Sequence, residues 1–309
     1  PSWWPSSSAW PPSGRVALPE LREAAAADIP AMLEVFFEAD EELRASDGRP
    51  PRQRETERLR PWFEHHLRHD RATSIVAEDH GRVVAYGVVM VRTRSGFLSE
   101  LFVAPRWQGR GLGRAVLREC LARAPFERMA TCTDAIQPVS TGLYASIGLA
   151  PRTPIYVLTG PLDPGALPGP RPGATTAPLA VGAVDALDRS ALGYQRPVDH
   201  AAWVTEGRRG LTFLDDDGVL AGYGYVHPNG RLGPVLAVDP ADLPAFAGEL
   251  VRSIAGAGDY RCVVPGPARD ALRALLAAGL RIDDSPGIYC ADHDRLRLDR
   301  YLPMSTALL

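Results

Sequence analysis

The chain has 309 residues, of which 45% are hydrophobic and 23% are charged, and its formal net charge is −3. These values are typical of a globular protein and exclude collagen, a coiled coil and extensive disorder. A slightly acidic chain has no general basic field for nucleic acid or an anionic membrane, so neither is expected as a partner.

The cysteines and the hydropathy pattern exclude several classes of protein. The four cysteines are Cys120, Cys132, Cys262 and Cys290, and none forms a C-x-x-C pair or a metal-ligand spacing with a histidine. Few scattered thiols in a long chain predict a reducing compartment, here the cytoplasm. No apolar run approaches the roughly 18 residues of a membrane span. Neither a metal site nor a membrane segment is therefore expected.

Composition divides the chain into four segments. Residues 1–14 are rich in Ser, Pro and Trp and lack the pattern of a signal peptide, so we expect a flexible N-terminal arm. Residues 161–178 are rich in Pro and Gly, which predicts a linker. This linker separates a first domain at residues 15–160 from a second domain at residues 179–309.

Strands and helices alternate in the first domain. A short strand at Leu21–Ala24 precedes a helix that begins at Asp28, where the acidic N-cap and the early Pro30 are typical of a helix start. A polar helix then covers Thr56–His69. The elements expected after it are strands at Ser74–Glu78, Val83–Arg92 and Phe97–Val103, a helix at Leu112–Ala124, a strand at Met129–Thr133, a helix at Pro138–Ile147 and a strand at Ile155–Leu158.

The second half of the sequence repeats features of the first. GRVVAYGVVMV at Gly81 resembles GVLAGYGYVHP at Gly218, and SELFVAP at Ser99 resembles GPVLAVDP at Gly233. A third pair joins TGLYASIGLAPR to ALRALLAAGLRI. Three anchors in the same order and at nearly constant offset predict a duplication. The expected fold class is therefore α/β, with two tandem mixed-sheet domains flanked by helices.

The segment LFVAPRWQGRGLGR, Leu101–Arg114, is the strongest candidate for a binding site. It follows a strand and opens a helix. Its glycines permit positive φ and a close approach of a ligand, and the first helical turn offers unpaired N–H groups at the positive end of the helix dipole. These features predict a seat for a pyrophosphate, to which Arg110 and Arg114 add charge. The glycine spacing fits neither a P-loop nor the dinucleotide fingerprint.

This strand, turn and helix resemble the acetyl-CoA motif of GNAT-family N-acetyltransferases. Gln108, Gly111 and Gly113 match the family pattern Q/R-x-x-G-x-G/A, and V-x-P precedes them at the expected spacing. Downstream, LYASIGL at Leu143–Leu149 is similar to the family's L-Y-x-x-x-G-F, with Leu149 in place of Phe. The resemblance extends over nearly the whole first half. It implies a GNAT-like α+β architecture with acetyl-CoA as co-substrate.

The resemblance also implies where acetyl-CoA binds. The backbone of Leu101, Phe102 and Val103 is expected to pair with the pantetheine arm like an added strand, and one of its N–H groups to polarise the thioester carbonyl. Gln137 lies where the family often has an Asn in contact with the cofactor. The pyrophosphate is expected on seven consecutive residues: Gln108, Gly109, Arg110, Gly111, Leu112, Gly113 and Arg114.

The implied reaction is direct transfer of an acetyl or short acyl group to an amine, carried by a small molecule or a peptide. By resemblance, Tyr144 is the general acid that protonates the departing thiolate, since a tyrosine pKa near 10 keeps it protonated. An alkylamine with a pKa of about 10 needs roughly 4 kcal/mol to lose its proton at pH 7. Glu100, next to the cofactor strand, is the first candidate for the base that helps this step.

Each of these assignments has a structural alternative. The glycines could mark only a tight turn, Tyr144 a half-buried aromatic residue, and Glu100 a solvated position on a strand. The acidic run Glu38–Glu42 is expected to be a solvated helix end. A non-catalytic acyl-CoA-binding regulatory or scaffold protein is the alternative function. The histidines of the polar helix are expected at the surface: His65, His66 and His69.

The second domain is expected to keep the scaffold and to lack the site. PADLPAF at Pro240–Phe246 replaces the glycine turn, and Leu275 stands where Tyr144 is expected. A degenerate copy of this kind would support the first domain. Because the duplication already provides a pseudo-twofold pair, the chain is expected to be a monomer or a homodimer.

Overall fold

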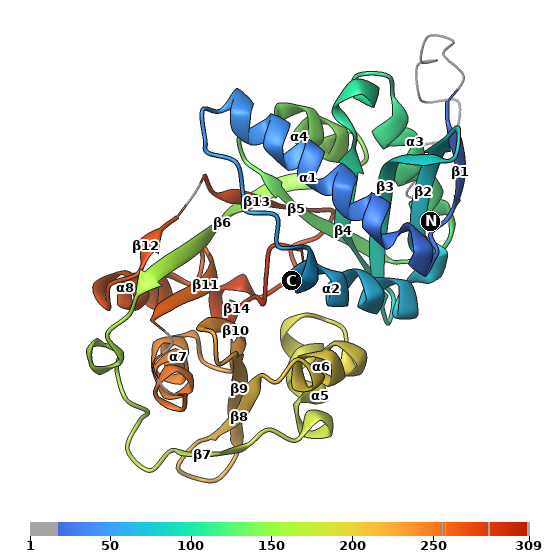
Figure 1. Ribbon diagram of the computed structural model, residues 1–309. Coiled ribbons are helices and arrows are strands. Elements are labelled where there is room, and N and C mark those ends of the chain that lie inside the picture. The colour runs from blue at the N-terminus through green and yellow to red at the C-terminus, as the bar shows by residue number, and fades with distance from the viewer. Residues whose placement is uncertain (1–17, 255, 257, 284, 308–309) are drawn as a thin grey trace. The chain divides into compact units, whose positions relative to one another are not determined.

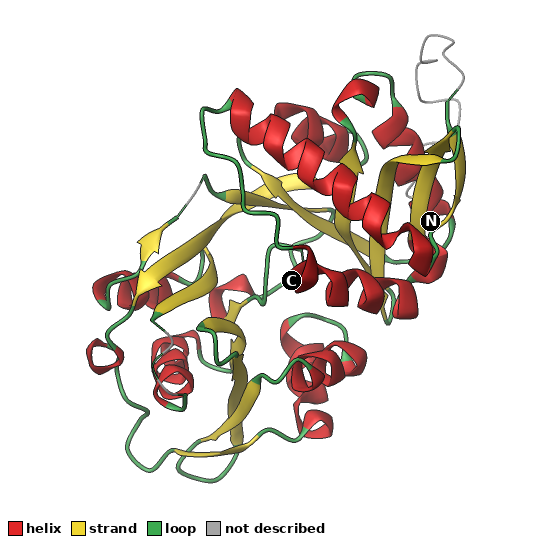
Figure 2. Ribbon diagram, viewed as in Figure 1, coloured by secondary structure: helices red, strands yellow, loops and turns green. Residues whose placement is uncertain are grey.

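The computed structural model describes residues 18–254, 256, 258–283 and 285–307, and the predicted arm at residues 1–14 lies outside this range. The described chain divides into two compact units (Figure 1). Unit 1 extends to Thr131 and includes Val139–Leu149, whereas unit 2 contains Cys132–Pro138 and the chain from Ala150 onward. Each unit has strands flanked by helices (Figure 2). The predicted α/β class with mixed sheets is therefore confirmed.

Unit 1 contains most of the elements predicted for the first half. Its strands follow the order β1-β2-β3-β4-β5, with β4 and β5 parallel and the others antiparallel. The elements are β1 (Glu20–Glu23), α1 (Ile29–Ser46), α2 (Thr56–His69), β2 (Ser74–Asp79), β3 (Arg82–Arg92), β4 (Ser95–Val103), α3 (Leu112–Ala122), β5 (Arg128–Asp134) and α4 (Pro138–Ala145). The end of β5, from Cys132, and the first residue of α4 belong to unit 2.

Alternation along β3 places helices on both faces of this sheet. Tyr86 and Val88 belong to a buried cluster with residues of α1 and α2, including Met32 and Phe63. The intervening Gly87 faces α3, where a Cβ would lie 2.9 Å from Cγ1 of Val116. Successive strand residues point to opposite faces, so one strand serves both cores.

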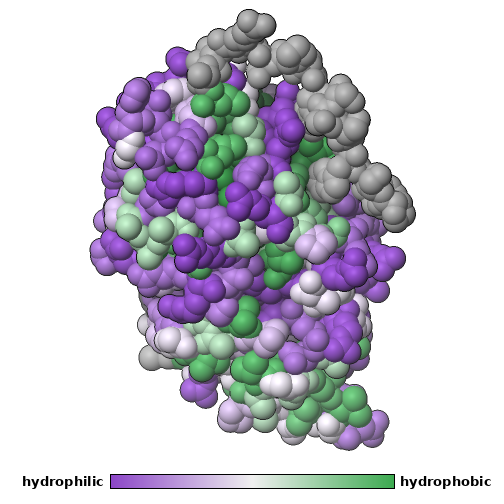
Figure 3. Space-filling view, turned by 90° about the vertical axis from the view of Figure 1, so that its right-hand side faces the viewer, coloured by the Kyte–Doolittle hydropathy of each residue, from purple (hydrophilic) through white to green (hydrophobic). Residues whose placement is uncertain are grey.

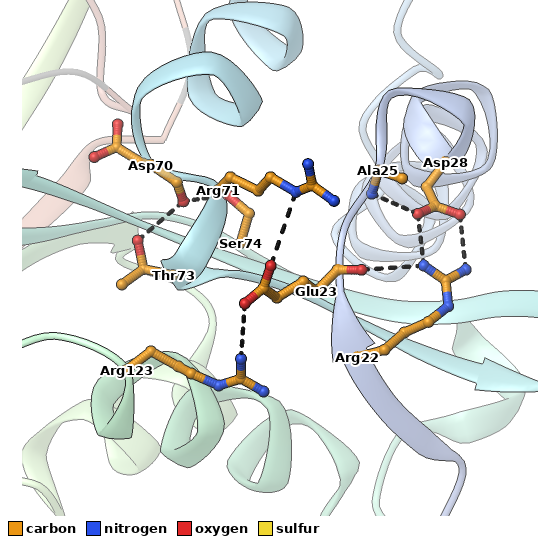
Figure 4. A network of polar contacts seen from close by, with 9 residues as sticks. All are labelled: Arg22, Glu23, Ala25, Asp28, Asp70, Arg71, Thr73, Ser74 and Arg123. Atoms are coloured by element: carbon orange, nitrogen blue, oxygen red, sulfur yellow. Dashed lines mark hydrogen bonds and ion pairs between the residues drawn. The ribbon is translucent and has the colours of Figure 1, made fainter.

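Ion pairs hold β1 against the helices of unit 1 (Figure 4). Arg22 donates from Nη1 and Nη2 to the two carboxylate oxygens of Asp28 at 2.7 and 2.9 Å. This guanidinium lowers the pKa of Asp28. Glu23 accepts from Nη1 of Arg123, the C-cap residue of α3, at 3.0 Å and lies 3.8 Å from Nε of Arg71. The short edge strand is thereby fixed to the start of α1 and to the end of α3.

A buried ion pair joins the end of α2 to β3. Nη1 of Arg92 donates to both carboxylate oxygens of Asp70, at 2.9 and 3.0 Å. The backbone N–H of Val91 donates to the same carboxylate at 2.8 Å. The hydroxyls of Thr73 and Ser74 donate to the carbonyl oxygen of Asp70. Asp70 and Arg92 are both buried, so each charge needs a partner, and the two groups compensate each other.

Unit 2 repeats the element order of the first half and has the strand order β13-β6-β11-β10-β9-β8-β7, with β12 on β6 and β14 on β10. Its elements are β6 (Ala150–Pro161), β7 (Thr175–Pro178), α5 (Val181–Ala191), α6 (Pro197–Thr205), β8 (Arg209–Leu214), β9 (Leu220–Val226), β10 (Arg231–Ala237), α7 (Leu243–Arg252), β11 (Asp259–Pro265), α8 (Arg269–Ala277), β12 (Arg281–Ile282), β13 (Gly287–Ala291) and β14 (Tyr301–Leu302).

The strand β6 is a part of unit 2. The sequence places this strand at the end of the first domain, but in the structure it pairs antiparallel with β11 along its full second half, Ile155–Pro161. Its first half pairs with β13. The Pro/Gly-rich stretch that follows contains β7, which pairs with β8. The first half of the sequence thus supplies one strand to the second unit.

Hydrophilic side chains predominate on the face drawn in Figure 3. On the face drawn in Figure 3, hydrophobic residues form small groups that hydrophilic residues separate. Among the described residues, no helix has the length and apolar character needed to cross a membrane.

Candidate active site

The strand β4 separates from β5 after Leu98. Ser95–Leu98 pair with Arg128–Thr131, and the ladder goes no further in the described part of the chain. The hydroxyl of Thr131 donates to the carbonyl oxygen of Leu98 at 2.8 Å, which holds the last paired position. Beyond it, Leu101–Val103 pair with β3 on one edge. The opposite edge is therefore oriented to accept an added extended segment.

A β-bulge accounts for this separation. Val88 of β3 lies opposite Glu100, whereas Val89 lies opposite Leu98, so Ser99 has no residue opposite it. An extra residue of this kind bends the strand and increases its twist. The bulge thus turns the second half of β4 away from the line of β5.

The side chains of Leu101 and Val103 face α3. A Cβ at Gly87, on the α3 side of β3, would lie 3.4 Å from Cδ1 of Leu101. A Cβ at Gly113, in the first turn of α3, would lie 3.3 Å from Cγ2 of Val103. Glycine at this position therefore lets the start of the helix approach the end of the strand.

The opposite face of β4 lies under α1 and α2. The ring of Phe102 stacks on Tyr86 at 5.7 Å between centroids and contacts Phe36 of α1 edge-to-face at 5.0 Å. Glu100 lies two residues before Phe102 and so points to the same face. The structure therefore puts the candidate base on the α1/α2 side and the backbone of Leu101–Val103 at the open edge between the two faces.

The glycine turn is exposed and has the backbone that the sequence predicts. Gly109 has φ of 72°, and Gly111 has φ of 82° as the N-cap of α3. Residues 108–111 are exposed, and a Cβ at Gly109 would meet no atom within 4 Å. Leu112 is buried and anchors the first turn of the helix. A helix start of this kind presents unpaired N–H groups to an anion.

Two contacts position the polar side chains of the turn. Nε2 of Gln108 donates to the carbonyl oxygen of Val103 at 3.1 Å, which ties the turn to the end of β4. The guanidinium of Arg110 lies 5.3 Å from the ring centroid of Trp107. Arg114 is half-buried in the first turn of α3. Both arginines are therefore at the turn that would hold the pyrophosphate.

The carboxyl of Glu100 has a pKa above that of an ordinary glutamate. Burial raises the pKa of its carboxyl to about 8, and the nearby hydroxyl of Tyr86 lowers it by a smaller amount. That hydroxyl has no hydrogen-bond partner at standard distance among the described residues. A carboxyl with a pKa close to neutrality can take up a proton at one stage of a reaction and release it at another.

Two histidines of α2 differ from expectation. His65 and His66 are buried, each 3% exposed, so their predicted surface location is wrong. His69 is exposed. Nε2 of His66 lies 3.4 Å from Oγ of Ser99, the bulged residue of β4. Sequence reasoning missed this contact, although Leu59, Phe63, His66 and Leu67 share one helical face.

Tyr144 and Gln137 belong to different units. Tyr144 lies on α4 within unit 1 and is 5% exposed. Its carbonyl oxygen accepts from the N–H of Leu149 at 3.0 Å, which closes the helix beside Gly148 with its φ of 92°. Gln137 is half-exposed and belongs to the segment Cys132–Pro138 of unit 2.

The acidic residues of α1 are partly neutralised. Arg54 pairs through Nη1 with Glu34 at 2.8 Å and through Nε with Glu41 at 2.9 Å. Nε of Arg52 lies 3.1 Å from the carboxylate of Asp40. The predicted helix end is instead the middle of α1, and the side chains of these pairs are partly exposed. Within the described residues, no group of three or more His, Cys, Asp or Glu side chains could hold a metal ion.

The family comparison agrees with this geometry. The sequence model of the acetyltransferase (GNAT) family matches residues 35–149. The matched stretch contains Glu100, the open edge of β4, the glycine turn and Tyr144. No curated protein sequence matches the chain.

Solved structures share the fold over nearly the whole chain. A proposed acetyltransferase from Pyrococcus horikoshii superimposes with a TM-score of 0.74 at 19% identity, covering 96% of this chain and 97% of that one. A GCN5-related N-acetyltransferase from Sphaerobacter thermophilus gives 0.57 at 20% identity, over 88% and 94%. A tandem GNAT protein from the clavulanic acid biosynthesis pathway gives 0.55 at 16% identity, over 88% and 97%. The predicted GNAT-like fold is confirmed by these likenesses.

Proposed function

We propose that unit 1 transfers an acetyl group from acetyl-CoA to an amine, because residues 35–149 match the sequence model of the acetyltransferase (GNAT) family. The observation that carries the proposal is the open edge of Leu101–Val103, which runs directly into the exposed glycine turn. An extended pantetheine arm and a pyrophosphate need these two features in this order. A short acyl group in place of acetyl is compatible with the same seat.

The residues of the turn fit the negative charge of the donor. Gly109 and Gly111 hold the backbone in the left-handed region, so that the N–H groups before α3 face solvent. Arg110 and Arg114 bring positive charge to the same place. The N-terminus of α3 adds the favourable end of its dipole. The N–H groups on the open edge of β4 would polarise the thioester carbonyl.

Glu100 is the proposed base. The attacking amine must lose its proton, and a carboxylate with a pKa of about 8 is a stronger proton acceptor than an ordinary glutamate. At pH 7 about one tenth of such a carboxyl is ionised. Glu100 would therefore take the proton as the amine attacks the carbonyl carbon. Its position on the α1/α2 side of β4 assigns the amine to that face.

Tyr144 is the proposed acid. The C–S bond of the thioester breaks as the new C–N bond forms, and the departing thiolate then needs a proton. A tyrosine hydroxyl can supply it, since an ordinary tyrosine is protonated at neutral pH. Its burial on α4 would keep bulk water from competing for this role.

The acceptor is proposed to be the amine of a small molecule or a peptide. The ion pairs of Arg52 and Arg54 reduce the negative charge of α1, so this helix offers no strong field for a polycation.

We also propose a cytoplasmic location, since the four cysteines are free thiols. A monomer or a homodimer would be consistent with these features.

The test is an acetylation assay over a panel of amines that includes arylalkylamines, polyamines, amino acids and short peptides. Thiol release from acetyl-CoA and the mass of the acetylated product are measured together. The proposal predicts stoichiometric product on at least one class of amine. Binding of acetyl-CoA with slow hydrolysis and no product on any amine would favour the non-catalytic acyl-CoA-binding protein.

A further inference from the structure

The strand β10 holds in unit 2 the place that β4 holds in unit 1. Each is the fourth strand of an antiparallel series, and each is followed by a helix and a parallel strand. The parallel ladder of β4 ends at Leu98, and that of β10 ends at Leu232. In both strands an irregularity of the antiparallel ladder follows directly. The two strands therefore open at corresponding positions.

Two tyrosines fix the correspondence residue by residue. Tyr86 of β3 pairs with Phe102 of β4, and Tyr223 of β9 pairs with Leu236 of β10. Both tyrosines come from the repeated A/G-Y-G sequence. Phe102 and Leu236 therefore occupy the same place in the two sheets. The stretch of β10 around Leu236 corresponds to the stretch of β4 that is proposed to pair with the pantetheine arm.

In unit 2 this edge is already occupied by the chain itself. The strand β14 pairs antiparallel with β10, with Leu302 opposite Val235 and Tyr301 opposite Leu236. Residues 301–304 are all buried. A Cβ at Gly233 would lie 2.5 Å from the carbonyl oxygen of Pro303, so glycine is required for this close approach.

A buried polar network holds β14 in place. Nη1 of Arg196 donates to the hydroxyl of Tyr301 at 2.6 Å, and Nη2 donates to the hydroxyl of Tyr223 at 2.7 Å. Nε of Arg196 donates to Oδ2 of Asp188 at 3.1 Å. Nε2 of His200 lies 2.8 Å from the same oxygen. Each of these side chains is at most 1% exposed, so Tyr301 is the link between the C-terminal segment and the core of unit 2.

The turn that corresponds to the pyrophosphate seat carries acidic residues. Asp242 is the N-cap of α7, and the carboxylate of Asp239 accepts from the N–H of Ala241 at 3.0 Å. Arg171 pairs with Asp239 and, through Nε at 2.7 Å, with Asp242. Two carboxylates at a helix start satisfy its positive end and oppose a second anion.

We infer that the C-terminal segment Tyr301–Met304 is a built-in occupant of the pantetheine groove of unit 2, and that it limits the chain to one coenzyme seat. The inference rests on the proposed function, because β4 defines what the corresponding groove of β10 would hold. Val235 and Leu236 are paired by the protein's own backbone in place of a pantetheine arm. The groove of unit 2 is thereby unavailable to a coenzyme.

Hydrogen exchange on the full chain, with and without saturating acetyl-CoA, tests this inference. The N–H groups of Val235–Ala237 that face β14 are expected to exchange slowly without ligand and to change less than about twofold when acetyl-CoA is added. Those on the open edge of Leu101–Val103 are expected to slow by at least about fivefold. Slowing at Val235–Ala237 with faster exchange at Tyr301–Leu302 would overturn the inference, because acetyl-CoA would have displaced β14.

The two segments report separately. A response at Leu101–Val103 with fast exchange at Val235–Ala237 in the free chain would overturn the inference and leave the proposed function intact. No response at Leu101–Val103 would overturn the proposed function and remove the premise of the inference with it.

A matched pair of variants tests the anchor. Tyr301→Phe removes the acceptor for Arg196, and exchange at Tyr301–Leu302 is expected to rise by about tenfold or more. Tyr289→Phe is the control, because the buried hydroxyl of Tyr289 has no hydrogen-bond partner among the described residues. This control is expected to leave the exchange of β14 unchanged. Equal effects of the two variants would contradict the role of Tyr301 as the anchor.

Discussion

Gln108 donates a hydrogen bond from Nε2 to the carbonyl oxygen of Val103 at 3.1 Å, and this bond ties the glycine turn to the end of β4. The two stretches proposed to contact the coenzyme are therefore fixed relative to each other. Gln108→Ala keeps the backbone and removes the bond. We expect acetyl-CoA affinity to fall by about two- to tenfold, the usual effect of one exposed hydrogen bond. Equilibrium titration measures this, and unchanged affinity would show that the bond does not position the turn.

Glu100→Gln tests the base through the pH dependence of the reaction. The carboxyl must be ionised to accept a proton, and its pKa is about 8. In the wild type, kcat/KM is therefore expected to rise as the pH increases toward 8. The Gln variant is expected to lose this rise and about a hundredfold or more in rate. An identical pH profile in the two proteins would exclude Glu100 as the base.

The same group predicts a pH dependence of stability. A free glutamate has a pKa near 4.3, and burial raises that of Glu100 in the folded state, so the folded protein binds more protons between these values. The free energy of unfolding is therefore expected to fall as the pH rises from about 4.5 to about 8. Glu100→Gln is expected to lose this component, which urea unfolding at several pH values would detect.

Tyr144→Phe separates chemistry from binding. If the hydroxyl protonates the departing thiolate, kcat is expected to fall by about a hundredfold or more, while the dissociation constant of acetyl-CoA changes by less than about threefold. Tyr260→Phe, which changes a buried tyrosine of unit 2, is the control and is expected to keep full activity. Unchanged turnover in Tyr144→Phe would contradict the assignment.

The ion pair of Asp70 and Arg92 is predicted to be the main electrostatic support of unit 1. Asp70→Ala removes one member of a buried ion pair, which costs about 3–5 kcal/mol in the free energy of unfolding. Glu127→Ala removes an exposed partner of Arg94 and is expected to cost less than about 1 kcal/mol. Urea denaturation compares the two variants. An equal loss in the free energy of unfolding in the two variants would contradict this prediction.

Local sequence signals predicted most elements of unit 1. Helix Thr56–His69 has the predicted bounds, and the predicted helix at Leu112 begins at that residue. The turn before it has positive φ at Gly109 and Gly111. These features depend on neighbours in the sequence, so composition and spacing are sufficient to identify them.

Features that depend on long-range pairing could not be predicted in this way. The sequence predicts that the strand at Ile155–Leu158 closes the first domain, but its partners are β11 and β13 of unit 2. A strand's pattern shows that it is buried and does not show which strand it pairs with. The short β14 gives no periodic signal, since Tyr301–Leu302 is too brief to have one.

The strand register of the repeat and the burial of polar residues also depend on partners that are distant in the sequence, so the sequence alone could not predict them. Aligning SELFVAP with GPVLAVDP on their shared valine and proline makes Val103 correspond to Val238, whereas strand pairing makes it correspond to Ala237. The isolated position of His200 in the sequence indicates no role, yet it lies at the centre of a buried network with Asp188 and Tyr225. A single polar residue in a helix is typical of solvent exposure, and only its partners from other elements reveal burial.

Calorimetric titration with acetyl-CoA on a matched glycine pair tests the central claim most directly. Gly109 and Gly81 both have positive φ, at 72° and 76°, and open space where a Cβ would lie, but only Gly109 lies in the proposed seat. The account predicts one site per chain in the wild type, the same in Gly81→Asp, and at least about a tenfold loss of affinity in Gly109→Asp, where a carboxylate opposes the pyrophosphate. Equal affinities in the two variants, or no binding in the wild type, would contradict it.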